Sequence, residues 1–131
     1  MFGTVFVWYE AFEKGRNTEM AEMFPDLADF FNEVNNKTYD LMKIFSDNLY
    51  IHPDFKGKTS IKKVLPVLVP SLSYKDLGIS EGLAATIKWF RTATWTCMND
   101  AERLGIFNDL REYCELDTKA MVEIFWVLSA L

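Results

Sequence analysis

The last third of the chain has the most regular pattern of apolar and polar positions. Over residues 108–128, apolar side chains recur at steps of three and four residues, which is the spacing of one buried helical face. These positions are Leu110, Tyr113, Cys114, Ala120, Met121, Ile124 and Leu128. The pattern predicts one amphipathic helix over this segment.

An acidic residue, Asp117, falls on that apolar face, one helical turn beyond Tyr113. A buried carboxylate is costly unless it is paired, hydrogen-bonded or bound to a metal. Side chains at positions i and i+4 of a helix project side by side, with bases about 6 Å apart along the axis. Tyr113 and Asp117 could therefore hold a divalent metal and orient a nucleophilic water. Alternatively, Asp117 forms a cap or a pair near the middle of the helix.

The start of the chain predicts a buried strand at residues 4–9, which are mostly β-branched or aromatic. A single strand cannot satisfy its own hydrogen bonds. Its partner is either a short strand near Tyr39 or Tyr50, or a strand outside these residues. Residues 39–45 read as a short strand or a helical turn, and residues 50–53 read as extended before a proline.

Helix caps and breakers predict the remaining helices. They cover residues 18–23 after an N-cap at Asn17 or Thr18, a restart beyond Pro25, residues 61–68 after Ser60, residues 81–97, and a short helix from Asn99 or Asp100 to Gly105. In the helix over residues 81–97, Leu83, Ile87, Phe90 and Thr94 lie on one side. With one or two strands and about five helices, the predicted fold class is a helix-rich α/β domain.

Composition indicates one folded domain over residues 1–131, because 50% of the residues are hydrophobic and 15% are aromatic. The net charge of −5 argues against broad electrostatic attraction to nucleic acid, so such binding would need a local basic patch. The densest candidate contains Lys56, Lys58, Lys62 and Lys63. The same lysines also fit a solvated loop and the start of a helix.

Cysteine and histidine are too few for a zinc site, since the chain has two cysteines, Cys97 and Cys114, and one histidine. Two cysteines favour a reducing compartment, and we predict a cytoplasmic protein with both thiols free and buried. The apolar start is short and lacks a basic region, so it is not typical of a signal peptide. No run approaches the roughly 20 apolar residues that span a bilayer, and we expect no membrane partner.

Several segments resemble known sequence motifs. Residues 6–13, FVWYEAFE, are similar to the second motif of DEDD-type exonucleases, and residues 113–117, YCELD, resemble the third motif in its tyrosine form, Tyr-x-x-x-Asp. Segments 39–42, 52–57, 60–66, 69–74 and 113–122 resemble, in order, an uncharacterised bacterial domain-of-unknown-function family that is regarded as ribonuclease H-like. The resemblance covers nearly the whole chain.

This resemblance implies a partial ribonuclease H-like fold and a metal-dependent 3'-5' exonuclease-like activity. Glu13 corresponds to the acid of the second motif, Asp117 to the acid of the third, and Tyr113 to its water-orienting tyrosine. Asp40 corresponds to an aspartate at the edge of the site. In such enzymes four carboxylates hold two Mg²⁺ or Mn²⁺ ions that cleave phosphodiester bonds. We therefore expect Tyr113 and Asp117 to point toward Glu13, and Lys62 and Lys63 to contact nucleic acid.

Two departures from the family pattern qualify the expected activity. Glu10 stands where the second motif has an asparagine, and the first motif, an Asp-x-Glu on an earlier strand, has no counterpart in residues 1–131. We therefore expect the C-terminal half of a nuclease domain, which binds metal weakly and is inactive until the missing N-terminal half is supplied. An alternative is a non-catalytic interaction module that forms a homodimer or binds a companion chain. A small-molecule-binding helical domain has no support beyond the aromatic content.

Overall fold

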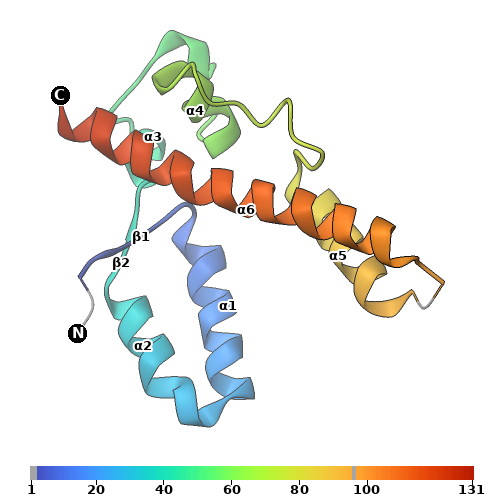
Figure 1. Ribbon diagram of the computed structural model, residues 1–131. Helices are drawn as coiled ribbons and strands as arrows, with labels where there is room; N and C mark the ends of the chain where they lie inside the picture. Colours follow the sequence, from blue (N-terminus) through green and yellow to red (C-terminus); the bar gives the residue numbers. More distant parts are fainter. Residues whose placement is uncertain (1–2, 96) are drawn as a thin grey trace. The chain divides into compact units, whose positions relative to one another are not determined.

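A computed structural model describes residues 3–95 and 97–131 of the chain (Figure 1). Its elements are β1 (Val5–Val7), α1 (Glu10–Met23), η1 (Pro25–Leu27), α2 (Ala28–Asn36), β2 (Thr38–Asp40), α3 (Lys43–Ser46), η2 (Pro53–Phe55), α4 (Ile61–Leu68), α5 (Gly82–Thr94) and α6 (Asp100–Ser129). Within the described residues this is six α-helices and one two-stranded sheet, so the helix-rich α/β class is confirmed.

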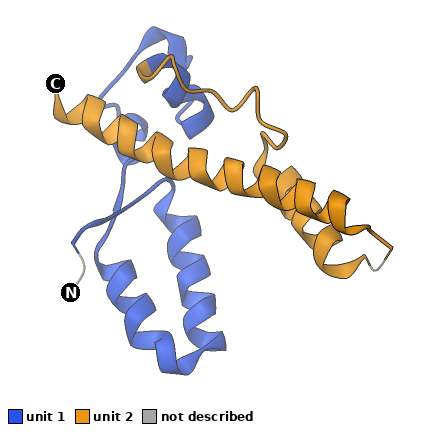
Figure 2. Cartoon of the chain, viewed as in Figure 1, with its two compact units in different colours: residues 1–67 blue, residues 68–131 orange. Residues whose placement is uncertain are grey.

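The chain divides into two compact units, residues 1–67 and residues 68–131 (Figure 2). Each unit is described separately below. That residues 1–131 form one domain stays a prediction. Among the described residues, no helix is both long and apolar enough to cross a membrane.

The sheet of unit 1 consists of β1 and β2, which run parallel, with Phe6 opposite Tyr39 and Val7 opposite Asp40. The expected pairing of the first strand with residues near Tyr39 is therefore confirmed. β1 is shorter than predicted because Tyr9 has a positive φ of 73°, which turns the backbone out of the strand. Residues 39–45 contain both elements that their sequence allows, a strand that ends at Asp40 and the short helix α3.

The first helix, α1, begins at Glu10, so the prediction of an N-cap at Asn17 or Thr18 was wrong. Asn17 instead donates a hydrogen bond to Asn35 of α2 at 2.9 Å, and the Thr18 hydroxyl donates to a backbone oxygen of its own helix. The restart at Pro25 is confirmed, since α1 ends at Met23 and α2 follows the short η1. α1 and α2 lie side by side as a helical hairpin (Figure 1).

Aromatic contacts form the core of unit 1. Leu41, Phe45, Phe55, Val64 and Leu65 are buried. The centroid of the Phe45 ring lies 5.5 Å from that of Trp8 and 5.6 Å from that of Phe55. These contacts connect the residues after β1 to α3 and η2. The indole N–H of Trp8 is satisfied by the backbone oxygen of Thr59 at 3.1 Å.

Unit 2 contains α5 and α6, and α6 is one continuous helix of 30 residues. Of the two predicted N-caps, Asn99 and Asp100, the structure has Asn99, which forms a capping box with Glu102. The predicted end at Gly105 was wrong, because a lone glycine costs a helix only about 1 kcal/mol and the flanking turns continue through it. The buried positions of α6 are Ala120 and Ile124, as its periodicity predicts.

The exposure of two sets of residues in unit 2 is notable, and the second set corrects a prediction. Leu83, Ile87 and Phe90 of α5 are 74%, 50% and 59% exposed, while Thr92 is the buried residue of that helix. Cys97 and Cys114 are free thiols, as predicted, but both are exposed. Cys97 lies in the turn between α5 and α6, and Cys114 is turned about 100° from Tyr113 around α6.

Candidate functional site

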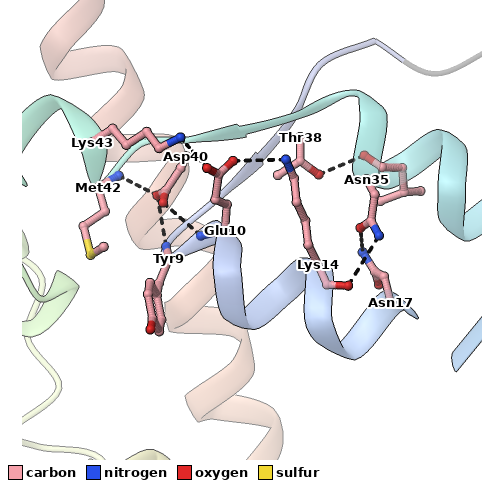
Figure 3. Close-up of polar contacts among 10 residues, drawn as sticks. Tyr9, Glu10, Lys14, Asn17, Asn35, Thr38, Asp40, Met42 and Lys43 are labelled. Atoms are coloured by element: carbon pink, nitrogen blue, oxygen red, sulfur yellow. Dashed lines mark hydrogen bonds and ion pairs between the residues drawn. The ribbon is translucent and has the colours of Figure 1, made fainter. Parts of the chain in front are cut away.

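Asp40 ends β2 and is almost completely buried, with 4% of its surface exposed. Its carboxylate accepts three backbone N–H groups, from Tyr9 at 3.0 Å, Glu10 at 2.9 Å and Met42 at 2.9 Å (Figure 3). Tyr9 and Glu10 stand at the start of α1, where the helix dipole favours a negative charge. Asp40 therefore acts as an N-terminal cap supplied by a distant strand, and it fixes the direction in which α1 leaves β1.

Glu10 occupies the position at which the resembled motif has an asparagine, and it forms ion pairs with two lysines of unit 1. Its carboxylate accepts a hydrogen bond from Lys43 and lies 3.1 Å from the ammonium nitrogen of Lys14 (Figure 3). These lysines, Lys43 first, hold the pKa of Glu10 below its usual value. Glu10 is therefore a charged group that links α1 to the start of α3.

Glu13 lies in the first turn of α1 and is partly exposed. Its backbone N–H donates to the carbonyl of Tyr9 at 3.4 Å, so the turn that Asp40 holds also places Glu13. A carboxylate in the first turn of the helix that follows a parallel strand suits a site, because ligands of open α/β sheets bind beyond the carboxyl ends of the strands.

Asp117 has a partner that the sequence analysis did not find. The hydroxyl of Tyr74 donates to Oδ1 of Asp117 at 2.5 Å, and Tyr74 is only 5% exposed. Asp117 itself is partly buried on α6. Of the two alternatives for Asp117, the pair near the middle of the helix is present, and a metal-binding role stays a prediction.

Tyr113 stands beside this pair. Its ring centroid lies 5.9 Å from that of Tyr74, with the planes tilted by 59°. Burial, followed by the negative charge of Asp117, raises the pKa of Tyr113 above its usual value. The pKa of Tyr74 is raised by burial first and by its hydrogen bond to Asp117 second. Both phenols therefore remain protonated hydrogen-bond donors over the physiological pH range.

One strip of α6 carries this group. An α-helix turns about 100° per residue, so positions 113, 117, 120 and 124 fall within about 60° of one another. Ala120 and Ile124 at its C-terminal end are fully buried, which anchors the helix next to Asp117. Tyr74 belongs to a segment that carries the family resemblance, but it is 43 residues from Asp117 and no periodicity links the two.

The predicted nucleic-acid contacts, Lys62 and Lys63, lie in the first turn of α4. Lys63 is exposed and Lys62 is partly buried, and the next two residues, Val64 and Leu65, are fully buried. This placement leaves the Lys63 ammonium group in solvent, where a phosphate could reach it. It equally suits a solvated helix start, and a role in binding stays a prediction.

The candidate acids are divided between the units, with Glu13 and Asp40 in unit 1 and Asp117 in unit 2. Their convergence on one site stays a prediction. Within the part of the chain that the structure describes, no group of three or more His, Cys, Asp or Glu side chains could hold a metal ion. Glu13 and Asp117 are hard oxygen donors of the type that Mg²⁺ and Mn²⁺ accept, but they make only half of a four-carboxylate set.

Comparison with known proteins connects the chain to an uncharacterised group. Residues 1–60 match the family described as "Domain of unknown function (DUF2779)". The chain is 32% identical to the uncharacterized protein UU173 of Ureaplasma parvum over 95% of its own length, and 29% identical to the uncharacterized protein MG366 of Mycoplasma genitalium over 95%. It spans 20% of the length of each of these relatives. No solved structure matches it. These similarities support a family of unknown function.

Proposed function

We propose that this chain contributes half of a metal-dependent, 3'-5' exonuclease-like site of the ribonuclease H-like type, which hydrolyses phosphodiester bonds. The observation that carries the proposal is the group on α6, where a partly buried carboxylate, Asp117, lies beside two protonated phenols. An acid in this setting suits a cation-binding role, because a ligand can neutralise its charge and the phenols can act on bound water.

In this proposal Glu13 and Asp117 bind Mg²⁺ or Mn²⁺ through carboxylate oxygens. When bound, the metal ions would supply an activated water and stabilise the leaving oxygen. Tyr113, which is one turn before Asp117 and remains protonated, orients the attacking water through its hydroxyl. Lys63, exposed on α4, contacts the phosphate backbone, together with Lys62.

The two remaining carboxylates come from sequence outside residues 1–131. The length of the relatives is consistent with this requirement, because the chain spans only 20% of them. Two carboxylates alone form a weak site for Mg²⁺, which gives up its waters reluctantly. We therefore expect the isolated chain to bind metal weakly and to have no robust nuclease activity.

The test is a Mn²⁺-dependent digestion of end-labelled single-stranded DNA and RNA. It is run with the chain alone and with the chain joined to an N-terminal half that carries the Asp-x-Glu motif. Cleavage should require the added half and should be abolished by Asp117→Asn. Glu115→Gln, an exposed acid two residues away on the same helix, is the matched control and should retain cleavage. Strong, chelator-sensitive degradation by the chain alone would contradict the proposal.

A second function, that of an interaction module, is favoured by the exposed side of α5. Leu83, Ile87 and Phe90 recur there at helical spacing and are at least half exposed. Such a stripe is typical of a surface that another polypeptide covers. In this alternative the chain forms a homodimer or binds a companion chain, without cleaving nucleic acid.

Sedimentation velocity at high concentration tests the interaction module. The alternative predicts association that is lost when Leu83 and Phe90 are both replaced by serine. Leu49→Ser, at an exposed apolar position outside the stripe, is the control and should leave association unchanged. A monomer at all concentrations, alone and with the N-terminal half, would remove the support for this alternative.

A further inference from the structure

We propose that unit 2 has a binding pocket for a nucleoside 5'-monophosphate, either free or at the end of a nucleic-acid strand, between α5 and the N-terminal turns of α6. The two helices lie side by side there (Figure 1). The hollow between them measures about 510 Å³, which is within the usual size range of small-molecule sites. The described residues that line it do not include Tyr74, Tyr113 or Asp117. The inference goes beyond the proposed function, because it needs neither a metal nor cleavage.

Arg91 supplies the positive charge that would bind the phosphate. Its guanidinium carbon lies 4.1 Å from the centroid of the Trp95 ring, which is within the range of a cation–π contact. Within residues 3–95 and 97–131, no acidic side chain forms an ion pair with this guanidinium. A guanidinium that packs on an aromatic ring still offers its N–H edge, and that edge matches two oxygens of a phosphate.

The other charged side chains that line the pocket have partners. The ammonium nitrogen of Lys88 lies 3.4 Å from Oδ2 of Asp109, so these two charges neutralise each other. Glu102 accepts the backbone N–H of Asn99 at 3.3 Å, as the acid of the capping box at the start of α6. α5 itself contains no acidic residue. The charge of Arg91 is therefore left for the ligand, and the pocket favours an anion.

The apolar part of the pocket suits a flat ring system. Trp95, Met98 and Ile106 line it, and Trp95 has 45% of its surface exposed. Nucleobases stack on aromatic side chains, and the thioether of a methionine also packs well on rings. A nucleotide joins such a ring to a phosphate, so it uses both parts of the pocket. Inorganic phosphate or a nucleoside would use only one of them.

Gly105 leaves the space that a ligand would fill. It lines the pocket from within α6, where a glycine weakens a helix relative to other residues. A Cβ atom built at Gly105 has no described atom within 4 Å. A larger side chain can therefore extend from this position without a clash at its base. Gly105→Leu should fill the pocket and favour the helix at the same time, which separates a lost site from a lost fold.

The experiment titrates the full chain with adenosine 5'-monophosphate in the presence of EDTA and follows the amide and indole N–H signals by NMR. We expect saturable shifts at Trp95, Met98 and Gly105. Adenosine and inorganic phosphate should each bind at least about tenfold more weakly, because each lacks one half of the ligand. A short single-stranded oligonucleotide with a 5'-phosphate distinguishes the two sources. Binding as tight as that of the mononucleotide or tighter assigns the pocket to a strand end, and weaker binding assigns it to the free nucleotide.

Two variants with matched controls locate the binding. Gly105→Leu should lower the affinity for adenosine 5'-monophosphate at least about tenfold. Its control is Gly15→Leu, at a glycine within α1 that also has open space around its added Cβ atom. Arg91→Lys keeps the charge but loses the planar fork, and should weaken the mononucleotide about tenfold without affecting adenosine. Arg111→Lys, at an exposed arginine of α6 outside the pocket, should change neither affinity.

Three results would overturn the inference. They are shifts at the pocket that do not saturate, equal affinity for adenosine and its monophosphate, and an affinity that neither Gly105→Leu nor Arg91→Lys lowers. Circular dichroism checks that each variant is folded, and if Gly105→Leu is not, Arg91→Lys decides alone. Because EDTA removes divalent metal, this titration and the Mn²⁺-dependent digestion can fail independently, so a failure of the pocket is distinguishable from a failure of the proposed function.

Discussion

Asp40 of unit 1 and Asp117 of unit 2 are both acidic side chains held by hydrogen bonds, but their donors differ in kind. Three backbone N–H groups converge on Asp40, which is almost fully buried. The side-chain hydroxyl of Tyr74 donates to one oxygen of Asp117, which is only partly buried. The backbone-bound Asp40 therefore has a structural task, whereas Asp117 is the acid to which we assign a ligand in the proposed function. The comparison predicts that replacing Asp40 lowers stability, whereas replacing Asp117 mainly lowers activity.

The largest expected effect on stability is that of Asp40→Ala. The substitution leaves the N–H groups of Tyr9, Glu10 and Met42 without their acceptor, and we expect the free energy of unfolding to fall by about 3 kcal/mol. Urea denaturation followed by circular dichroism measures the change. Asp54→Ala, at an exposed acid in the first turn of the short helix η2, is the control and should have a much smaller effect. Equal effects of the two variants would contradict the capping role of Asp40.

The second prediction concerns Asp117→Asn, which should affect activity much more than stability, in contrast to Asp40→Ala. An amide oxygen can still accept the Tyr74 hydroxyl, so the free energy of unfolding should change by about 1 kcal/mol or less. The same variant should lose cleavage when the chain is joined to the Asp-x-Glu half. The two measurements are urea denaturation and the Mn²⁺-dependent digestion. A large loss of stability would show that Asp117, like Asp40, is mainly structural.

The third prediction is a loss of stability at high pH that originates in unit 2. The folded-state pKa values of Tyr74 and Tyr113 are raised, so the unfolded chain releases these protons first as pH rises. Their contribution to stability is fully present below the ordinary tyrosine pKa of about 10 and is lost as pH rises above it. Urea midpoints between pH 8 and 11 should show this fall. Tyr74→Phe should flatten it, whereas Tyr39→Phe, at an exposed tyrosine, should not.

The smallest expected effect on stability is that of Glu10→Asn, which introduces the asparagine of the resembled exonuclease motif. The pKa of Glu10 is lowered, chiefly by Lys43, so this acid contributes stability above its ordinary pKa of about 4.3 that is lost as pH falls further. Because exposed ion pairs are weak, the urea midpoint at pH 7 should barely move. A shift as large as that of Asp40→Ala would mean that the ion pairs, rather than the cap, hold α1.

Local patterns could be read from the sequence, whereas contacts between distant segments could not. Helical spacing predicted the strip of α6 that contains Tyr113, Asp117 and Ala120, and strand composition predicted β1 and a partner near Tyr39. The start of α1 was misplaced because its cap, Asp40, lies 30 residues beyond Glu10. Tyr74 was missed for the same reason, since only the folded chain brings it to Asp117.

Neither apolar spacing nor residue type alone predicted which side chains are buried. The apolar side of α5 has the pattern of a core helix, yet Leu83, Ile87 and Phe90 face solvent in the structure. An apolar stripe indicates a surface that is suited to be buried, but it does not show whether the same chain or another polypeptide buries it. Residue type was also a poor guide to burial for the cysteines, because both are exposed although free cysteine is commonly buried.

The cap that Asp40 provides also bears on the order in which unit 1 folds. The first turn of α1 receives its acceptor only when β2 has reached β1, so helix initiation at Glu10 and strand pairing become one cooperative event. A helix with its own N-cap can nucleate locally, whereas α1 depends on a loop closure across 30 residues before its first turn is complete. The left-handed backbone conformation of Tyr9 also depends on strand pairing, because the Asp40 carboxylate that accepts its N–H belongs to β2. The β1–α1 junction should therefore behave in folding as a non-local, late-forming element, although its residues are adjacent in sequence.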